Sequence, residues 1–505
     1  MIQKRILDSV HGNIYVDSIY FNHLIDTPEF QRLRRIEQTS IRSIFPSARH
    51  DRFIHSIGVY HIGTLFTSQL YNDAIENDWF GITETKYQQI VESYHIACLL
   101  HDIAHAPFSH TFEKYFGRIS NLKKQLKQAF GATCPIDDKD LEREANFHEY
   151  ASAILVLQKF SQQIKTLGAD KELVVRMIIG CVYSRENDVL TQIKNCFITL
   201  LNGGIIDADR LDYACRDVWA SGYSTSSIDV SRLVSGLHIS MNKDGKYEVC
   251  YRSNVLNEIK GVLDVKEFQT KHVIHHHTVV YEQEMLVRAA EQMALEMLPD
   301  NIIKKINKSK KGDRGTLALE KIISLQSLTE NSSKDAIKLN NGNVISYITD
   351  DDLVYLMKNC KDNDYYKQWA SRQYSMFALW KTPDEFYYYY PEIASKTISK
   401  NLNDCQEMLT KTLSKKGYKS FIVKLEEFKP RVRIDKLKIL IGKDLIDYSL
   451  INHEQECSKD ETTPFFYIYI SKQHIANYDN IKVRVEQKEQ IIESLKTTIL
   501  SMYKN

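Results

Sequence analysis

A short stretch of the chain, LLHDIAHAPFSH (residues 99–110), combines three histidines with an aspartate. His101 and Asp102 are adjacent, His105 follows four residues after His101, and His110 lies just beyond a proline. Residues four apart on a helix share a face, so we expect His101 and His105 to look towards one cavity. A packed core has little use for so many imidazoles, whereas a metal ion and a phosphate ester would use all of them. The stretch therefore predicts metal-dependent chemistry on a phosphate.

Two further segments offer ligands of the same kinds. RFIHSIGV contains His55, with Arg52 three residues earlier on the same helical face. IDADRLDYACRD contains Asp209, and Tyr213 and Asp217 follow on the same face. A set of imidazoles and carboxylates suits a divalent metal ion such as Mn, Fe, Zn or Ni, or Mg where water and phosphate complete the shell. Such an ion polarises a phosphoryl oxygen and lowers the pKa of a bound water, while nearby imidazoles exchange protons around neutral pH.

Each segment alone also has a plainer interpretation. His55 could be a hydrogen-bonded core histidine, and Asp212 with Arg216 could be an ion pair on a surface helix. The basic run 304–314 is more typical of a solvated loop than of a phosphate or RNA site. The histidines of 272–278 would point in diverging directions on a helix, which disfavours a metal cluster there. The order His, His-Asp, Asp along the chain is what favours a metal site.

The composition narrows the classes of function. The 505 residues contain 66 Lys and Arg against 65 Asp and Glu, so neither nucleic acid nor an anionic membrane is expected as a partner. We find no apolar run long enough to span a bilayer, and the start MIQKRILDSVHG lacks the apolar core of a signal peptide. The nine cysteines include no CxxC pair, which is typical of reduced thiols. These features predict a cytoplasmic protein.

The elements that must position these residues are expected to be helices. Residues 20–300 show apolar positions at helical spacing with little strand-like alternation. Pro28, behind a cap at Asp26 and Thr27, is expected to open a helix over 29–39. Pro107 should end the helix that carries His101 and His105.

The character of the sequence changes after the polar stretch 329–343. Residues 432–441 and 465–471 alternate or run apolar like strands, and the chain ends in a helical segment. The predicted fold is mainly α. A helical core covers 1–300, a helix and polar linker cover 301–345, and a smaller α+β lobe for regulation or oligomerisation covers 346–505.

The order of the four ligands resembles the signature of the HD superfamily of metal-dependent phosphohydrolases. The resemblance extends over residues 4–290 to the dNTP triphosphohydrolase branch, with no preceding SAM domain. The matching blocks are DSVHGNIYV, DTPEFQRLRRIEQ, FPSARHDRFIHSIGV, LLHDIAHAPFSH, FHEYAS and IDADRLDYACRD. The resemblance implies an HD-domain helical core that cleaves a dNTP into deoxynucleoside and inorganic triphosphate.

The resemblance also implies a role for individual residues. The metal ligands would be His55, His101, Asp102 and Asp209. His110 matches the general acid at the leaving 5′ oxygen, with support from Glu113 and His148. Phosphates would be held by Arg52, His105, Arg210 and Tyr213. On the sugar side, Gln38 would read the 3′-hydroxyl, with Asp217 nearby.

Two departures from the family pattern affect the sugar side. Lys266 stands where the family usually has an arginine, and Ile274 stands where it usually has a tyrosine beneath the sugar. The turn after Gln38 also differs, reading QTSI instead of QLGG. These changes leave the preferred dNTP open, while the metal ligands are unaffected.

The last set of implied residues is regulatory: Lys4, Asp26, Gln31 and Arg34 match positions that hold an activating nucleotide between subunits. The implied assembly is a homo-tetramer or another homo-oligomer. A plainer alternative is that Asp26 caps the helix and Arg34 forms a surface ion pair.

Two rival functions remain within the same fold. One is a phosphodiesterase that acts on another nucleotide, although no GYP block follows the His-Asp pair. The other is a nucleotide sensor with little hydrolysis, whose expected mark would be a lost ligand, and all four ligands are present.

Overall fold

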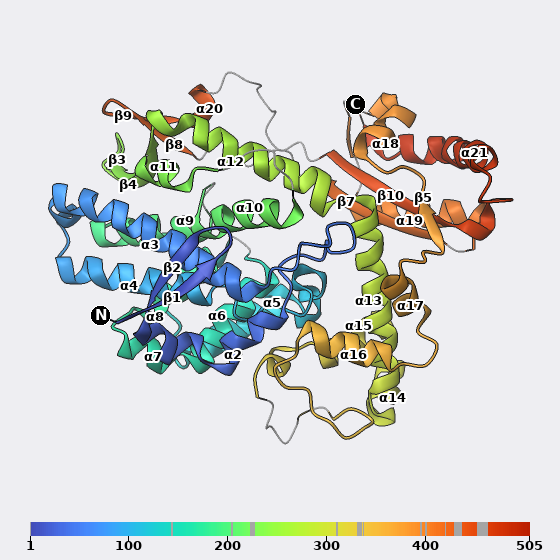
Figure 1. Ribbon diagram of the computed structural model, residues 1–505, viewed down its shortest axis with the longest axis horizontal. Coiled ribbons are helices and arrows are strands. Elements are labelled where there is room, and N and C mark those ends of the chain that lie inside the picture. The colour runs from blue at the N-terminus through green and yellow to red at the C-terminus, as the bar shows by residue number, and fades with distance from the viewer. Residues whose placement is uncertain are drawn as a thin grey trace. The chain divides into compact units, whose positions relative to one another are not determined.

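The computed structural model describes residues 2–142, 145–203, 206–222, 228–309, 312–330, 336, 338–393, 396–398, 401–419, 421–428, 437–451 and 463–504. The fold is mainly α, as the sequence predicts (Figure 1). The chain forms two compact units. The first comprises Met1–Lys266, Ala290–Lys361 and Arg433–His453, and the second comprises Glu267–Ala289, Asp362–Val432 and Glu454–Asn505. This division differs from the predicted segments 1–300, 301–345 and 346–505, which stay a prediction.

Most helices belong to the first unit. They are α1 (Ser18–Tyr20), α2 (Pro28–Gln31), α3 (Arg52–Glu76), α4 (Glu84–Leu100), α5 (Ile119–Phe130), α6 (Phe147–Lys159), α7 (Ser161–Thr166), α8 (Lys171–Ile178), α9 (Val189–Leu201), α10 (Ala208–Ser221), α11 (Val230–Ser235), α14 (Asp300–Lys308), α15 (Arg314–Ile322), α16 (Asp350–Lys358) and α20 (Tyr448–Ile451). The helices α12 (Leu256–Phe268) and α13 (His277–Met297) each contain a boundary between the units.

The helix α3 is the central element for the predicted site. Its first turn is capped by Asp51, whose side chain accepts a hydrogen bond from the backbone N–H of Ile54. It packs against α4 and α10, and α10 is capped in the same way by Asp207 through the N–H of Arg210. The start of α3, the end of α4 and the start of α10 therefore meet, and these are the places where the predicted metal ligands lie.

Two small sheets complete the first unit. The strands β1 (Gln3–Asp8) and β2 (Gly12–Asp17) form an antiparallel hairpin. A four-stranded sheet has the order β3 (Leu237–Met241), β4 (Tyr247–Arg252), β8 (Lys438–Ile441) and β9 (Asp444–Asp447), with β4 and β8 parallel. The hairpin β3–β4 lies in a region that the sequence led us to expect as helical, so that expectation is wrong there. The strand β8 falls within the strand predicted over 432–441, of which 432–436 lie outside the described residues.

The second unit has its own core around Trp380, which is fully buried with Phe466, Ile468 and Leu495. Its sheet has the order β5 (Met376–Ala378), β10 (Thr463–Ser471) and β7 (Phe421–Phe428), and β6 (Thr397–Ile398) pairs with β11 (Tyr503–Lys504). The strand β10 includes the predicted strand 465–471. Its helices are α17 (Asp364–Ser371), α18 (Pro383–Tyr389), α19 (Leu402–Lys415) and α21 (Ile481–Leu500). No helix in the described part of the chain combines the length and apolar character needed to cross a membrane.

The helix predicted over 29–39 is shorter than expected. After α2 the backbone continues as a 3-10 helix over Arg32–Arg35 and becomes extended at Ile36. The extended segment pairs with the chain before α3: the N–H of Arg52 donates to the carbonyl of Ile36 (2.9 Å), and the N–H of Gln38 donates to the carbonyl of His50 (3.0 Å). This tertiary pairing replaces the helical hydrogen bonds and places Gln38 beside the start of α3.

Candidate active site

The first cluster of site residues is formed by His55 from α3, His101 after α4 and Asp209 from α10. Their nearest ligand atoms lie within 4.8 Å of one another. The Oδ1 of Asp209 is 3.0 Å from Nε2 of His55 and 3.7 Å from Nε2 of His101. The Oδ2 of Asp102 lies 3.5 Å from each of the same two nitrogens. The structure thus brings the four predicted metal ligands together.

The donor set of this cluster fits a divalent metal ion. The Nδ1 of His101 is engaged with the carbonyl of Cys98 at 2.9 Å, and because a carbonyl only accepts, Nδ1 carries the proton. The buried Nε2 of His101 then has a free lone pair and finds no hydrogen-bond partner among the described residues. A buried acceptor of this kind beside two carboxylates is the arrangement that a cation satisfies.

A fully buried carboxylate, Asp212, holds the other ligating imidazole. It contacts Nδ1 of His55 (2.7 Å) and Nε2 of His11 (2.7 Å), and it accepts hydrogen bonds from Nε and Nη2 of Arg216 (both 2.8 Å). Space for it exists only because residue 58 is glycine, since a Cβ there would lie 1.9 Å from Oδ1 of Asp212. Asp212 and Arg216 are therefore a buried pair that turns Nε2 of His55 towards the cluster, not a surface ion pair. His11 is a residue that sequence reasoning missed.

The charges of this cluster favour ionised carboxylates. Burial alone would lower the pKa of His55, but hydrogen bonds to Asp209 and Asp212 raise it to about 9. Burial would raise the pKa of Asp102, but the charge of Arg52 outweighs this and holds the pKa well below its usual value. The pKa of Asp209 is lowered in the same way by the two histidines, against the effect of burial. Asp102 and Asp209 are therefore ionised, and a cation that binds here would replace the proton that His55 shares with Asp209.

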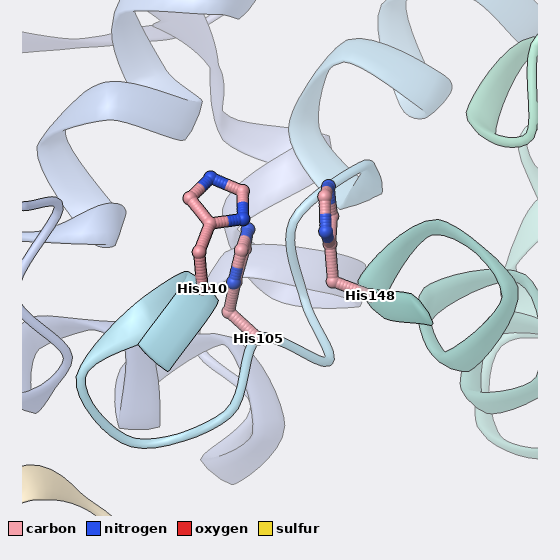
Figure 2. A group of neighbouring side chains, drawn as sticks. All are labelled: His105, His110 and His148. Carbon is pink, nitrogen blue, oxygen red and sulfur yellow. The ribbon is translucent and has the colours of Figure 1, made fainter. Parts of the chain in front are cut away.

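A second cluster contains His105, His110 and His148 (Figure 2). The rings of His105 and His148 are stacked, with centroids 4.1 Å apart and planes 17° from parallel. Parallel imidazoles do not converge on one cation, so this cluster suits an anion and proton transfer better than a metal ion. Glu113 lies beside it, 2.6 Å from Nδ1 of His148 and 3.2 Å from Nδ1 of His110. The His110 side chain is 63% exposed, so it can reach a bound ligand.

The members of this second cluster differ in charge. Burial and the charge of Arg52 lower the pKa of His105 well below its usual value, which leaves it neutral. Burial acts the same way on His148, but the bond to Glu113 prevails and raises its pKa to about 9. For Glu113 burial would raise the pKa, and the two histidines lower it instead. At neutral pH a neutral imidazole is thus stacked on a cationic one.

Arg52 connects the two clusters. Its guanidinium donates to Oδ2 of Asp102 (2.6 Å), to Oγ of Ser109 (2.9 Å) and to the carbonyl of Gln38 (3.1 Å). The other oxygen of Asp102 lies 3.2 Å from Nε2 of His105. Arg52, predicted to hold phosphate, is thus buried and engaged with protein atoms.

The segment that carries His101 and His105 is not the helix, ending at Pro107, that the sequence predicts. The helix α4 ends at Leu100, and the following turns are tighter: the N–H of Ile103 donates to the carbonyl of Leu100, and that of His105 to the carbonyl of Asp102. Phe108 and Ser109 then have φ of 53° each, the left-handed region that costs an L-residue about 1–2 kcal/mol. These turns, and not a shared helical face, separate His101 from His105 and send them to different clusters.

The residues predicted on the sugar and phosphate side lie around α10. Nε of Arg210 is 3.4 Å from Asp207. Burial and the charge of Arg210 lower the pKa of Lys266 to about 8. Tyr213 packs against the small apolar cluster of Ala214, Val218 and Val265.

The other two predicted sugar-side residues differ: Asp217 pairs with a histidine, whereas Gln38 has a side-chain oxygen that the described residues leave unsatisfied. Asp217 is 2.7 Å from Nε2 of His50. The buried Oε1 of Gln38 has no hydrogen-bond partner in the described part of the chain. This oxygen could therefore accept a hydrogen bond from a hydroxyl group of a ligand.

The four predicted regulatory residues form two contacts. Nζ of Lys4 lies 3.5 Å from Oδ2 of Asp26, and Nε of Arg34 donates to Oε1 of Gln31 at 2.9 Å. Arg34 also covers the ring of Phe53 at 3.4 Å. The helix α2 is capped by the side chain of Thr27, not by Asp26. The plainer explanation of Asp26 as a helix cap is therefore wrong.

Comparisons with known proteins agree with this geometry. The HD domain family matches residues 52–178, which include His55, His101 and Asp102. An uncharacterized protein of Mycoplasma genitalium is 30% identical over 266 residues, 52% of this chain and 54% of that protein. The deoxynucleoside triphosphate triphosphohydrolase SAMHD1 of Danio rerio is 40% identical over 297 residues, 54% of this chain and 41% of that protein. The chain spans about half the length of the curated relatives it matches first.

The fold itself has a solved counterpart. A crystal structure of a hypothetical protein from Aquifex aeolicus has a TM-score of 0.58 and 19% identity, and the likeness covers 96% of this chain and 100% of that one. At this identity the likeness concerns the fold alone.

Proposed function

We propose that this chain is a metal-dependent phosphohydrolase that cleaves deoxynucleoside triphosphates into deoxynucleoside and inorganic triphosphate. The observation that carries the proposal is the pairing of the two clusters. A set of ligands with an unsatisfied imidazole nitrogen, at His101, lies next to a proton-exchanging group, at His110. The similarity to the deoxynucleoside triphosphate triphosphohydrolase of Danio rerio supports dNTPs as the substrate class.

The metal ion would be held by His55, His101, Asp102 and Asp209. When bound, it would supply a Lewis acid that neutralises charge on the reacting phosphate. The donor set of imidazoles and carboxylates suits Mn, Fe, Zn, Ni or Mg.

The chain's own residues would handle the proton of the reaction. A water oxygen forms a bond to the α-phosphorus and that water gives up a proton to the solvent, while the bond from the phosphorus to the 5′ oxygen breaks. His110 gives a proton to the leaving 5′ oxygen. Glu113 holds Nδ1 of His110, which leaves Nε2 as the atom that faces a ligand. The cationic His148 offsets phosphate charge.

Regulation belongs to the same proposal. Lys4, Asp26, Gln31 and Arg34 would bind an activating nucleotide between subunits of a homo-tetramer or another homo-oligomer. A nucleotide that binds the assembled state links activity to its own concentration. In the cytoplasm such an enzyme would lower dNTP pools, for homeostasis or antiviral defence.

Product analysis tests the proposed reaction. The purified protein is incubated with each dNTP and each NTP and with several divalent metals, and products are separated by anion exchange. We expect triphosphate and deoxynucleoside from at least one dNTP, loss of this activity in Asp102→Ala, and full activity in Asp138→Ala, whose side chain is 94% exposed. Orthophosphate or pyrophosphate as the product, or full activity in Asp102→Ala, would contradict the proposal.

Mixtures of nucleotides test the regulation separately. Hydrolysis of one dNTP should rise when a second nucleotide is added, together with the mass measured by light scattering. The Asp26→Ala/Arg34→Ala variant should lose this response. Unchanged rates and mass in every mixture would refute the regulatory part alone.

A further inference from the structure

A buried carboxyl group far along the chain joins two backbone segments of the site. Asp350, the first residue of α16, is 6% exposed. Its Oδ2 accepts a hydrogen bond from the N–H of Glu37 (2.8 Å), and its Oδ1 accepts one from the N–H of Phe108 (2.6 Å). One side chain thus binds both segments at once.

Both segments carry site residues. Phe108 is the first of the two left-handed residues that precede His110, and a strained turn keeps its shape only when its surroundings hold it. Glu37 precedes Gln38, and the carbonyl of Glu37 accepts a hydrogen bond from Oγ of Ser109. Asp350 therefore holds the turn through the backbone of Phe108, while Arg52 holds it through the side chain of Ser109.

A second group supports the same turn at its other end. Arg32 is buried, and its Nε donates to the carbonyl of Ile348 at 2.7 Å. Its Nη2 donates to the carbonyl of His105. The segment 348–350 thus reaches the beginning of the turn through Arg32 and its end through Asp350.

We propose that Asp350 is a positioning residue that holds the turn over Phe108 and Ser109, so that His110 meets the leaving oxygen of the substrate. The carboxyl of Asp350 accepts its hydrogen bonds from the backbone N–H groups of Glu37 and Phe108, so it acts through the backbone. The inference rests on the proposed function for the role of His110.

The next residue provides a matched control. Asp351 is also at the start of α16, but its side chain is 69% exposed and pairs with Arg35 at 3.0 Å. The variants Asp350→Asn and Asp351→Asn make the same chemical change one residue apart. In Asp350→Asn the amide nitrogen cannot accept, so one of the two backbone hydrogen bonds is lost.

The test compares two leaving groups. When a dNTP is cleaved, the leaving group is the 5′ alkoxide of the deoxynucleoside, which needs a proton. When bis(4-nitrophenyl) phosphate is cleaved, the leaving group is 4-nitrophenolate, which is stable without one. We expect Asp350→Asn to lose about 10- to 100-fold in kcat with a dNTP, to keep the wild-type rate with the nitrophenyl ester, and to keep its bound metal. Asp351→Asn should match the wild type on both substrates. An equal loss on both substrates, or no loss on either, would overturn the proposal.

Hydrogen exchange of the backbone amides measures how firmly the turn is held, and it does not depend on enzyme activity. The peptide that contains Phe108 should exchange about 10- to 100-fold faster in Asp350→Asn than in Asp351→Asn, and unchanged exchange would overturn the proposal. If the wild type releases no triphosphate, the proposed function fails, while this measurement still decides whether Asp350 holds the turn. Should Asp350→Asn not fold, Arg32→Lys, which can reach only one of its two carbonyls, should show the same dependence on the leaving group and the same faster exchange.

Discussion

Replacing Gly58 by alanine should damage the metal site although residue 58 is not a ligand. The new Cβ would lie 1.9 Å from Oδ1 of Asp212 and 2.5 Å from Nη2 of Arg216. Asp212 must retreat by about 1.1 Å to restore a contact of 3.0 Å. A movement of that size takes its other oxygen out of hydrogen-bond range of Nδ1 of His55, now 2.7 Å away.

The expected losses of stability and of metal affinity follow from the two contacts of Asp212 that are disturbed, one with Arg216 and one with His55. Overpacking a helix contact costs about 1–3 kcal/mol, and disrupting the buried pair of Asp212 and Arg216 adds to this, towards the 3–5 kcal/mol typical of a broken buried ion pair. The loss of the group that orients a ligating histidine lowers metal affinity about 10- to 100-fold. Gly58→Ala should therefore be less stable and bind metal more weakly.

Replacing a second glycine by alanine should change the stability in the opposite direction. Gly261 lies in α12, where a Cβ would meet no atom within 4 Å. Gly261→Ala should stabilise the protein by up to about 1 kcal/mol through helix propensity. Thermal unfolding of the apo proteins and competition with a chelator measure the two effects. Equal stability and metal affinity in Gly58→Ala and the wild type, or equal destabilisation by both substitutions, would refute the packing argument.

Two further predictions concern the second cluster. His110→Ala should lose about 10²–10⁴ in kcat while it keeps its metal, as measured by steady-state hydrolysis and elemental analysis; loss of the metal would make His110 a ligand. The second prediction is that the stability advantage of the wild type over Glu113→Gln depends on pH. Because bonding to Glu113 raises the pKa of His148 from 6.5 to about 9, and the same bond lowers the pKa of Glu113 from 4.5, this advantage should be full between about pH 4.5 and 6.5 and should fall as the pH rises through about 9. Urea unfolding at a series of pH values measures it, and an advantage that grows above pH 8 would contradict the assignment.

Helical spacing predicted part of the site well. Arg52 and His55 do lie on one turn of α3, and Asp209, Tyr213 and Asp217 do lie along α10. These groupings depend only on local periodicity within uninterrupted helices, which a sequence displays directly.

Other features depended on contacts between distant segments. The burial of Asp212 requires Gly58 in another helix, and neither residue shows this in its own neighbourhood. The same holds for Asp350, whose partners lie more than two hundred residues earlier. The end of α4 at Leu100 was also missed, because the tighter turns after it are held by the site around them.

One missed element did have a local signal. The hairpin β3–β4 closes through Asn242 and Lys246, whose backbones are hydrogen-bonded at 2.8 Å, and Gly245 with φ of 77° takes the left-handed position that ends such a three-residue loop. The alternation on either side of that loop could have predicted the hairpin.

Hydrolysis in ¹⁸O-labelled water tests the central claim most directly. We expect that a single turnover with a dNTP transfers one labelled oxygen to the α-phosphorus of the released triphosphate and none to the deoxynucleoside. Label in the 5′-hydroxyl of the deoxynucleoside, or in orthophosphate or pyrophosphate, would contradict it, because the bond between the α-phosphorus and the 5′ oxygen would then not be the one that breaks.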